Sequence, residues 1–269
     1  MIRKLSIALS ILLVLSCNKV DHGNESSDQT EPKFVVDKIL DSEDRVLAEY
    51  KYLDNFNLHK RICYSVKGNI ISELIFQYED NQISAIEHID NQFPENSYTL
   101  KFKLDSKGNI IEDYKYNFGV LIEHRKFKYG SNNKIESISN SEGLEYLKFS
   151  YLETGNVLKT SLLLPDYSRL TQGRNLRNEI GMYEYDDKRK PNFGLGKVFQ
   201  INPYPNSDEE NIIEQNLSTN NIKKVVHSIS YWEYTYNEFG FPLTIEQKFQ
   251  GFDDIETQTL KLVYKEIGL

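Results

Sequence analysis

Aromatic residues near the C-terminal end of the chain are the first candidates for binding chemistry. The segment Tyr231–Tyr236 contains the one tryptophan of the sequence, Trp232. Side chains alternate along a strand, so Trp232, Tyr234 and Tyr236 share one face. If this face is exposed, it forms a platform on which sugar rings can stack. If it is turned inward, the three residues belong to an aromatic β core.

Acidic and histidine-containing segments offer two metal-binding hypotheses. Asp186-Asp187 and Asp208–Glu210 carry the oxygen ligands that calcium prefers, but neither has the spacing of an EF-hand, and acidic loops are commonly just solvated. The segments ending in His88 and His124 share the pattern Ile-Glu-His, and zinc would require these histidines to converge from different strands. No CxxC or HExxH motif supports zinc. We therefore predict no metal and no cofactor.

Motifs that would indicate an enzyme are missing from the sequence. It contains no GxSxG elbow, no P-loop and no dinucleotide-binding fingerprint. With 40 acidic residues some carboxylate pair is inevitable, so a glycosidase dyad chosen from them would be arbitrary. We predict a protein without catalytic residues.

The first seventeen residues have the parts of a bacterial export signal. Arg3 and Lys4 form a basic start, and Leu5–Leu15 is an apolar run too short to cross a bilayer, which takes about 20 helical residues. The following segment, Val14-Leu15-Ser16-Cys17, resembles the lipobox of bacterial lipoproteins. This resemblance implies cleavage before Cys17 and attachment of diacylglycerol and a further acyl chain, such as palmitate, to it. The alternative is a plain secretory signal with an incidental cysteine.

Residues 17–33 are predicted to be a flexible, lipid-anchored tether. They are polar, contain no aromatic residue and include Pro32. A coil of this length spans roughly 20–25 Å on average, which holds the following domain away from the lipid surface. The acidic residues after Cys17 resemble surface-export signals of Bacteroidetes lipoproteins. We therefore expect a signal peptide at 1–16, the tether at 17–33 and one domain at 34–269, anchored to the outer membrane and exposed on the cell surface.

Charge and cysteine content exclude several partners and cross-links. Without Arg3 and Lys4 the chain has 30 basic and 40 acidic residues, a net charge of −10, which repels phosphate backbones and argues against nucleic acid. Cys63 is the one cysteine besides Cys17, so lipidation of Cys17 leaves no partner for a disulfide. Cys63 lies in an apolar stretch and is predicted to be a small buried residue, with a reactive thiol as the alternative.

The composition and a repeated pattern both indicate β-structure. Alanine, the best helix former, occurs after the signal at Ala48 and Ala85 alone, against 18 tyrosines and 14 phenylalanines. An aromatic-x-Tyr pair recurs, followed by a turn with Asn or Gly and then an aliphatic strand. The third residue of this unit falls at Tyr52, Tyr78, Leu104, Tyr129, Tyr151, Tyr185 and Tyr236. Each unit predicts a hairpin that must pair with its neighbours to be stable.

The spacing of aliphatic residues in the return strands has two explanations. Ile83 and Ile86, like Ile135 and Ile138, are three residues apart and would face opposite sides of a regular strand. Either a bulge intervenes or both faces of the sheet are partly covered. Two stretches interrupt the repeat, one after Leu164 and one at about 194–228, where Glu209–Leu217 favours a short helix.

We therefore predict an all-β fold. It is an antiparallel sheet of repeated β-hairpins, rolled into an open barrel or a sandwich, with a short irregular or helical insertion packed on one side. The sequence does not determine whether this curved sheet closes into a barrel.

The hairpin unit resembles the tyrosine-aspartate (YD, or Rhs-like) repeats of bacterial surface proteins. Tyr185-Asp186, the segment 218–222 and Gly240-Phe241-Pro242 follow in an order similar to that of a Bacteroidetes lipoprotein family of uncharacterised function. Most earlier units lack the Asp after Tyr. The resemblance implies a β-rich exported domain and brings no catalytic residues.

These observations favour a non-enzymatic cell-surface lipoprotein. Its expected role is that of a binding or scaffold module whose ligand is a glycan or another envelope protein, and it meets the membrane through the lipid on Cys17. The alternative is a carrier whose curved sheet encloses a lipid or another apolar ligand, and a hydrolase is the third hypothesis.

Overall fold

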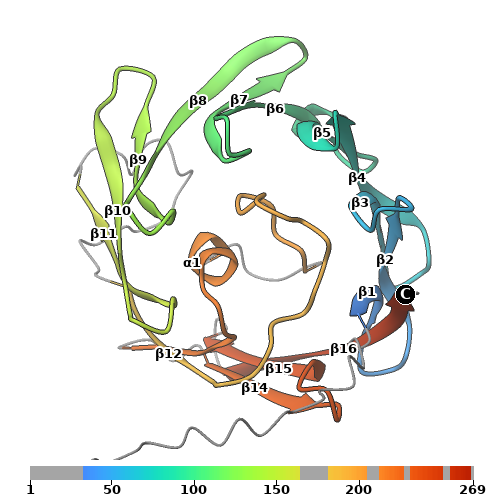
Figure 1. The fold of residues 1–269 in the computed structure, drawn as a ribbon. Coiled ribbons are helices and arrows are strands. Elements are labelled where there is room, and N and C mark those ends of the chain that lie inside the picture. The colour runs from blue at the N-terminus through green and yellow to red at the C-terminus, as the bar shows by residue number, and fades with distance from the viewer. Residues whose placement is uncertain (1–32, 164–180, 205–211, 227–230, 251–254, 268–269) are drawn as a thin grey trace, which may run out of the picture.

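A computed structural model describes residues 33–163, 181–204, 212–226, 231–250 and 255–267. Sixteen antiparallel strands form one closed barrel, in which each strand pairs with its neighbours in sequence and β1 pairs with β16 (Figure 1). The all-β, antiparallel hairpin architecture predicted from the sequence is confirmed. The structure adds that the sheet closes completely.

The elements, in chain order, are β1 (Lys33–Leu40), β2 (Val46–Tyr52), β3 (Leu58–Tyr64), β4 (Ile70–Glu79), β5 (Gln82–Asp90), η1 (Pro94–Asn96), β6 (Tyr98–Leu104), β7 (Ile110–Asn117), β8 (Val120–Tyr129), β9 (Ile135–Asn140), β10 (Glu145–Tyr151), β11 (Val157–Leu162), β12 (Gly181–Tyr185), α1 (Ile212–Leu217), β13 (Ile222–Val225), β14 (Tyr231–Tyr236), β15 (Pro242–Gln250) and β16 (Ile255–Ile267).

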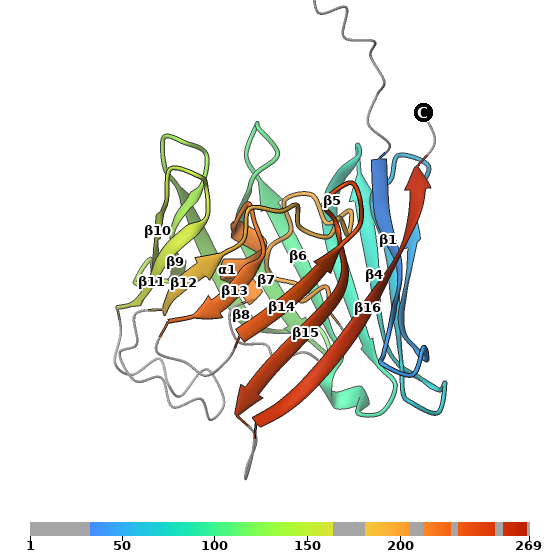
Figure 2. The same ribbon diagram turned by 90° about the horizontal axis from the view of Figure 1, so that it is seen from below.

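Successive turns alternate between the two rims of the barrel, because every strand runs antiparallel to the one before it. β1 begins and β16 ends at the same rim, which we call the proximal rim (Figure 2). The turns at 53–57, 105–109, 130–134, 152–156 and 237–241 also lie there. The opposite, distal rim carries the turns at 65–69, 91–97, 118–119 and 141–144.

Bulges next to the proximal turns resolve the spacing of the aliphatic residues. Tyr78 pairs with Ile83 while Gln77 pairs with Ala85, so one extra residue lies in β5 and brings Ile83 and Ile86 to the same face. The same register shift occurs at Tyr129 and Ile135. Of the two explanations offered by the sequence, the bulge is correct.

A belt of tyrosine hydroxyl groups links each hairpin to the preceding one. Tyr129 Oη donates a 2.9 Å hydrogen bond to the carbonyl of Ile110, and Tyr151 Oη a 2.7 Å bond to that of Ile135. Ile135 is the bulged partner of Tyr129, so Tyr151 bonds to the bulge that Tyr129 faces. The tyrosines bonded in this way are Tyr52, Tyr78, Tyr129, Tyr151, Tyr185, Tyr234 and Tyr264, with donor–acceptor distances of 2.6–2.9 Å. Leu104 interrupts the belt in the unit where leucine replaces tyrosine.

The segment between β12 and β13 lies inside the barrel rather than packed on one side of the sheet. This plug, described for residues 186–204 and 212–221, includes α1 and is surrounded by the strands (Figure 1). Plug residues Phe193, Val198, Phe199 and Ile201 are buried in one hydrophobic core together with the inward side chains of the wall. The described part of the insertion predicted at about 194–228 therefore fills the barrel as far as Asn221, and Ile222–Val225 forms the wall strand β13. α1 falls within the predicted helix at Glu209–Leu217.

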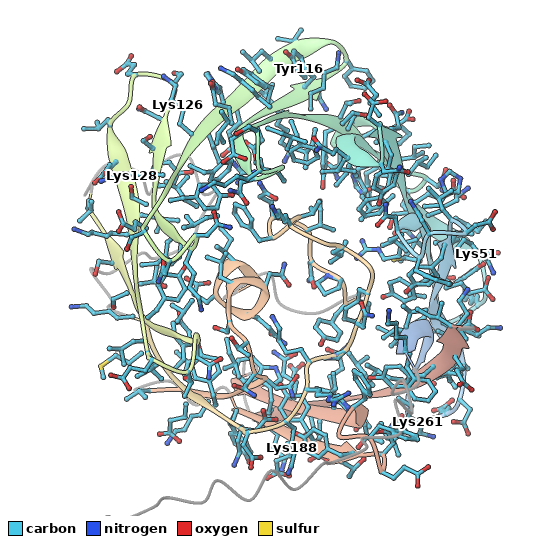
Figure 3. All side chains as sticks on the ribbon, in the orientation of Figure 1. Lys51, Tyr116, Lys126, Lys128, Lys188 and Lys261 are labelled. Carbon is cyan, nitrogen blue, oxygen red and sulfur yellow. The ribbon has the colours of Figure 1, made fainter. Side chains whose placement is uncertain are left out.

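The outward face of the wall carries charged side chains in cross-strand pairs. Lys60 and Glu73 approach within 2.9 Å, and Lys103 and Glu112 within 2.6 Å. Lys51 and Lys261 also point away from the ring (Figure 3). A lipid-facing barrel has an apolar outer band about 25 Å tall, in which each Lys or Arg costs about 2–4 kcal/mol at the midplane. The described outer wall carries charged pairs of a kind that such a band excludes.

Candidate functional site

The plug and the wall meet in the most elaborate polar contacts of the described chain, and these contacts form the candidate site. Asp186 fastens the two ends of the plug together. Its carboxylate accepts hydrogen bonds from the backbone N–H groups of Lys188 and Asn221 at 3.1 and 3.2 Å, and from the Asn221 side chain at 3.0 Å. The hydroxyl of Tyr236 donates to the same carboxylate. The Asp of the Tyr-Asp pair, Asp186, thus holds the two ends of the plug together.

A second set of contacts anchors the plug to the wall at β2 and β3. Tyr50 is fully buried, and its hydroxyl donates to the carbonyl of Pro203. Arg61 Nη1 donates to the carbonyl of the neighbouring Asn202. Burial raises the pKa of Tyr50 far above its ordinary value, so the hydroxyl stays protonated and remains a donor.

A buried ion pair between β7 and β8, elsewhere around the barrel, also reaches the plug. Arg125 Nε and Nη2 donate to the two carboxylate oxygens of Asp113 at 2.9 and 2.6 Å, and Asp113 is 0% exposed. Gln200 of the plug donates to Asp113 Oδ2 at 3.1 Å. A bidentate arginine and an amide together satisfy a carboxylate that would otherwise be costly to bury.

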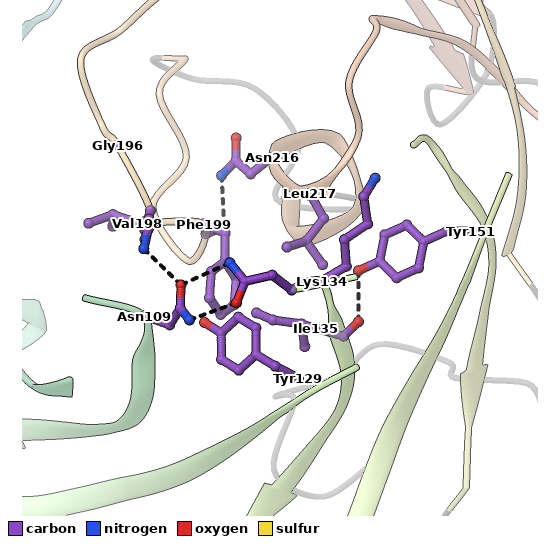
Figure 4. Close-up of a pocket in the computed structure, with 12 residues that line it drawn as sticks. Asn109, Tyr129, Lys134, Ile135, Tyr151, Gly196, Val198, Phe199, Asn216 and Leu217 are labelled. Carbon is purple, nitrogen blue, oxygen red and sulfur yellow. Dashed lines mark hydrogen bonds between the residues drawn. The ribbon is translucent and has the colours of Figure 1, made fainter. Parts of the chain in front are cut away.

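A small pocket lies where the plug passes the proximal turns of β6 to β10 (Figure 4). Its volume is about 210 Å³. Lys197 of the plug donates to the carbonyl of Lys107 at 2.6 Å and to Asn109 Oδ1 at 2.8 Å, and Asn109 bonds to Asn133 at 2.9 Å. Asn216 of α1 donates to the carbonyls of Phe199 and Ile201 at 2.7 and 2.9 Å.

Two lysines next to this pocket are desolvated. Burial lowers the pKa of Lys134, whose Nζ donates to the carbonyl of Gly155 and lies 4.8 Å from the ring centroid of Tyr151. Burial, assisted by Lys134, lowers the pKa of Lys190 to about 8. Lys190 Nζ donates to the carbonyls of Gln215 and Asn216 at 2.6 and 3.1 Å, at the C-terminal end of α1 where a cation is favoured.

The polar groups in and around this pocket connect the plug to the wall. The amide and ammonium groups in the pocket bond to one another and to backbone carbonyls across the boundary between plug and wall. Pockets for drug-sized ligands enclose about 300–1,000 Å³. The pocket therefore serves to hold the plug in place.

The aromatic residues selected from the sequence take part in the interior of the barrel. Trp232 and Tyr234 pack against the hydrophobic core, and Tyr234 belongs to the tyrosine belt. Tyr234 pairs across the sheet with the buried Ile245, which confirms that it faces inward. Tyr236 stacks on Tyr234 with ring centroids 6.1 Å apart and bonds to Asp186. Trp232, Tyr234 and Tyr236 thus occupy the positions expected of an aromatic β core and not those of an exposed platform.

The other residues selected from the sequence are dispersed. Cys63 is buried and has no disulfide partner among the described residues. His88 lies on the inner face beside Tyr98, whereas His124 lies on the outer face, 2.7 Å from Glu112, so the two histidines do not converge. The described residues contain no group of three or more metal-binding side chains. Cys17 and Asp208–Glu210 lie outside the part of the chain that the structure describes, and the lipidation and signal-peptide predictions remain predictions.

Sequence reasoning missed the plug contacts themselves. Asp113 and Arg125 face each other across the β7–β8 hairpin, but Gln200 lies 87 residues from Asp113 in the chain, and all three are in segments that resemble ordinary charged strands and loops. A possible signal was the position of Asp113, which pairs with the inward-facing Phe102 and so belongs to the apolar set of its strand pair. Among the described residues no helix is long and apolar enough to cross a membrane.

Comparisons with known proteins identify the fold. No protein-family model matches the chain, and no curated protein matches it in sequence. A porin-like protein from Bacteroides uniformis superimposes with a TM-score of 0.51 at 13% identity, covering 86% of this chain and 98% of that one. The shared property is the fold alone.

Two further solved structures resemble the chain less closely. A porin-like protein from Bacteroides vulgatus gives a TM-score of 0.44 at 14% identity, covering 85% of this chain and 98% of that one. A TcdB2-TccC3 structure gives 0.32 at 12% identity, covering 84% of this chain and 14% of that one.

Proposed function

We propose that this protein is a lipid-anchored barrel of the cell envelope that works as a binding or scaffold module. The observation that carries the proposal is the filled interior. The plug is bonded to the wall through Tyr50, Arg61 and Asp113 on two sides of the barrel, and its apolar residues share the core of the wall. A barrel that uses its interior as a core offers its outer surface to partners.

A channel is the alternative raised by the description of one structural neighbour as porin-like. Two features of this chain argue against it. The plug occupies the space through which a solute would pass, and the outward face carries ion pairs such as Lys60–Glu73 where a spanning barrel would meet lipid. The plug likewise takes the space that a carrier of apolar ligands would need. A glycan or another envelope protein, bound on the outside, remains the proposed ligand.

The position of the proximal rim suits an N-terminal lipid anchor. β1 begins at this rim, and the polar tether joins it directly to Cys17 in the sequence. Two or three acyl chains hold a water-surrounded domain at a membrane essentially permanently, because each buried methylene contributes about 0.8 kcal/mol. The barrel then needs no apolar band of its own.

Labelling cells with palmitate and fractionating them tests this proposal. We expect the wild-type chain to be labelled and to sediment with membranes, and the Cys17→Ser chain to be unlabelled and to leave the membrane fraction. A Cys17→Gly variant controls for the effect of the introduced hydroxyl. The mass of the Cys17→Ser chain shows whether its signal has been removed. If the chain without its signal remains in the membrane after washing with urea, the barrel itself holds the bilayer and the proposal is wrong.

A further inference from the structure

The tip of the β7–β8 hairpin concentrates apolar residues at the surface. Phe118 is 76% exposed, Val120 65% and Ile122 55%, and Leu121 lies between the last two. Other exposed apolar side chains, such as Val66, Leu144 and Val263, are scattered over separate elements, whereas these four fall within five consecutive positions. In Figure 1 the hairpin leans away from the ring of strands.

Phe118 occupies a backbone position that disfavours it. Phe118 and Gly119 form a two-residue turn with φ of 46° and 78°. Such turns strongly prefer Asn or Asp followed by Gly, and positive φ in a bulky residue is a genuine outlier. The equivalent turn between β4 and β5 uses Asp80 and Asn81, with φ of 49° and 61°. Neither folding nor packing explains a phenylalanine at this tip.

A second loop of the distal rim extends the apolar surface. Asn117, at the base of the hairpin, donates to the carbonyls of Glu95 and Ser97 at 2.8 and 2.7 Å. These bonds hold the loop between β5 and β6 against the hairpin, and Phe93 of that loop is 55% exposed. Phe93 is thus a further exposed apolar side chain in the loop next to the hairpin.

The side chains on the outer face of the hairpin change from apolar to tyrosine to lysine with distance from the tip. Behind the apolar tip lie Tyr116, which points outward (Figure 3), and Tyr114. Lys101 Nζ lies 5.5 Å from the ring centroid of Tyr116, and Lys103 and Lys126 follow further from the tip. This order matches the layers of a phospholipid surface. Aliphatic side chains enter the hydrocarbon, tyrosines lie at the interface, and lysines reach the phosphate groups.

We propose that the β7–β8 hairpin inserts its tip into a phospholipid surface and so gives the barrel a second, reversible membrane contact. The protrusion is thin and convex, whereas protein-binding hot spots are central, well-packed pockets, so lipid is the partner that fits it. The inference rests on the proposed lipid anchor for its biological setting. A tether of sixteen residues extends to at most about 55 Å, longer than the roughly 33 Å of a ten-residue strand such as β8, so anchor and hairpin can reach one membrane.

Co-sedimentation with vesicles tests the contact without the anchor. The chain from Asn18 to Leu269 retains the whole barrel, because β1 and β16 close it within the described residues. We expect this chain to bind phosphatidylcholine vesicles and Phe118→Asn to bind about 10- to 100-fold more weakly, as loss of one inserted phenylalanine predicts. Asparagine suits the turn, so its melting temperature should be equal or higher. Val66→Ser, at another exposed turn of the distal rim, serves as the matched control and should bind like the wild type.

Three results would overturn the inference. These are absence of vesicle binding by the wild-type chain, equal binding by Phe118→Asn, or a shift from dimer to monomer on that substitution in the absence of vesicles. The last result would make the hairpin an interface between two copies of the chain. Each leaves the palmitate experiment unaffected, so failure of this inference is distinguishable from failure of the anchor.

Discussion

Replacing Arg125 with methionine is expected to lower the free energy of unfolding by about 3–5 kcal/mol. The substitution removes both hydrogen bonds to Asp113, which is 0% exposed. Methionine fills similar volume but leaves the carboxylate without its charge partner, and the remaining donor, Gln200, is neutral. Urea denaturation at pH 7 measures the change.

Two further variants separate burial from charge. Asp113→Asn combined with Arg125→Met should recover part of the loss, since no unpaired charge remains. Lys103→Met removes an exposed ion pair on the neighbouring strand pair β6–β7, that with Glu112 at 2.6 Å, and should cost less than about 1 kcal/mol. A loss below 1 kcal/mol in Arg125→Met would show that the Asp113 site is hydrated and that plug and wall do not enclose it.

Raising the pH above about 10 is expected to unfold the barrel within about two pH units. Burial raises the pKa of the belt tyrosines, to about 12 in Tyr78, while unfolded tyrosine titrates near 10. The folded state therefore retains protons that the unfolded state releases, and stability falls as pH rises. The slope is about 1.4 kcal/mol per pH unit for each fully buried tyrosine and less for the half-buried ones. Several such groups together exceed the usual 5–15 kcal/mol of a folded domain.

Lys190 acts in the opposite direction at lower pH. Its pKa is about 8 in the folded state and near 10.5 when unfolded, so the folded state binds fewer protons in this range and stability rises. We expect a stability maximum at about pH 9–10 and a steep decline above it. Urea midpoints at a series of pH values, combined with tyrosinate absorbance, measure both the rise of stability up to the maximum and its decline above it. Ionisation of all 18 tyrosines, belt members included, near pH 10 without loss of β-sheet circular dichroism would contradict the belt.

The sequence was sufficient to predict the hairpins but not the closure of the sheet. The aromatic-x-Tyr pairs, the Asn and Gly turns and the spacing of Ile83 and Ile86 are local signals, and the structure contains the corresponding strands and bulge. Closure depends on β1 pairing with β16, which lie at opposite ends of the chain. No local pattern states which strands meet across such a distance.

The plug was beyond sequence reasoning for a related reason. Outside α1 its described residues form neither helix nor strand, because their place is set by contacts with walls that are distant in sequence, such as Lys197 with Asn109. The recurring tyrosines were recognised as a pattern, whereas their role as belt donors required the bulged carbonyls of the neighbouring hairpins. Trp232 could not be placed from sequence because alternation defines a shared face without saying which side it takes.

Sedimentation velocity of residues 18–269 in detergent-free buffer tests most directly whether this barrel is filled by its own chain and surrounded by water. We predict one compact species with a β-sheet circular dichroism spectrum, because the charged wall needs no lipid and the core is completed by the plug. A chain that stays folded solely in detergent, or that conducts ions when added to a planar bilayer, would contradict the account.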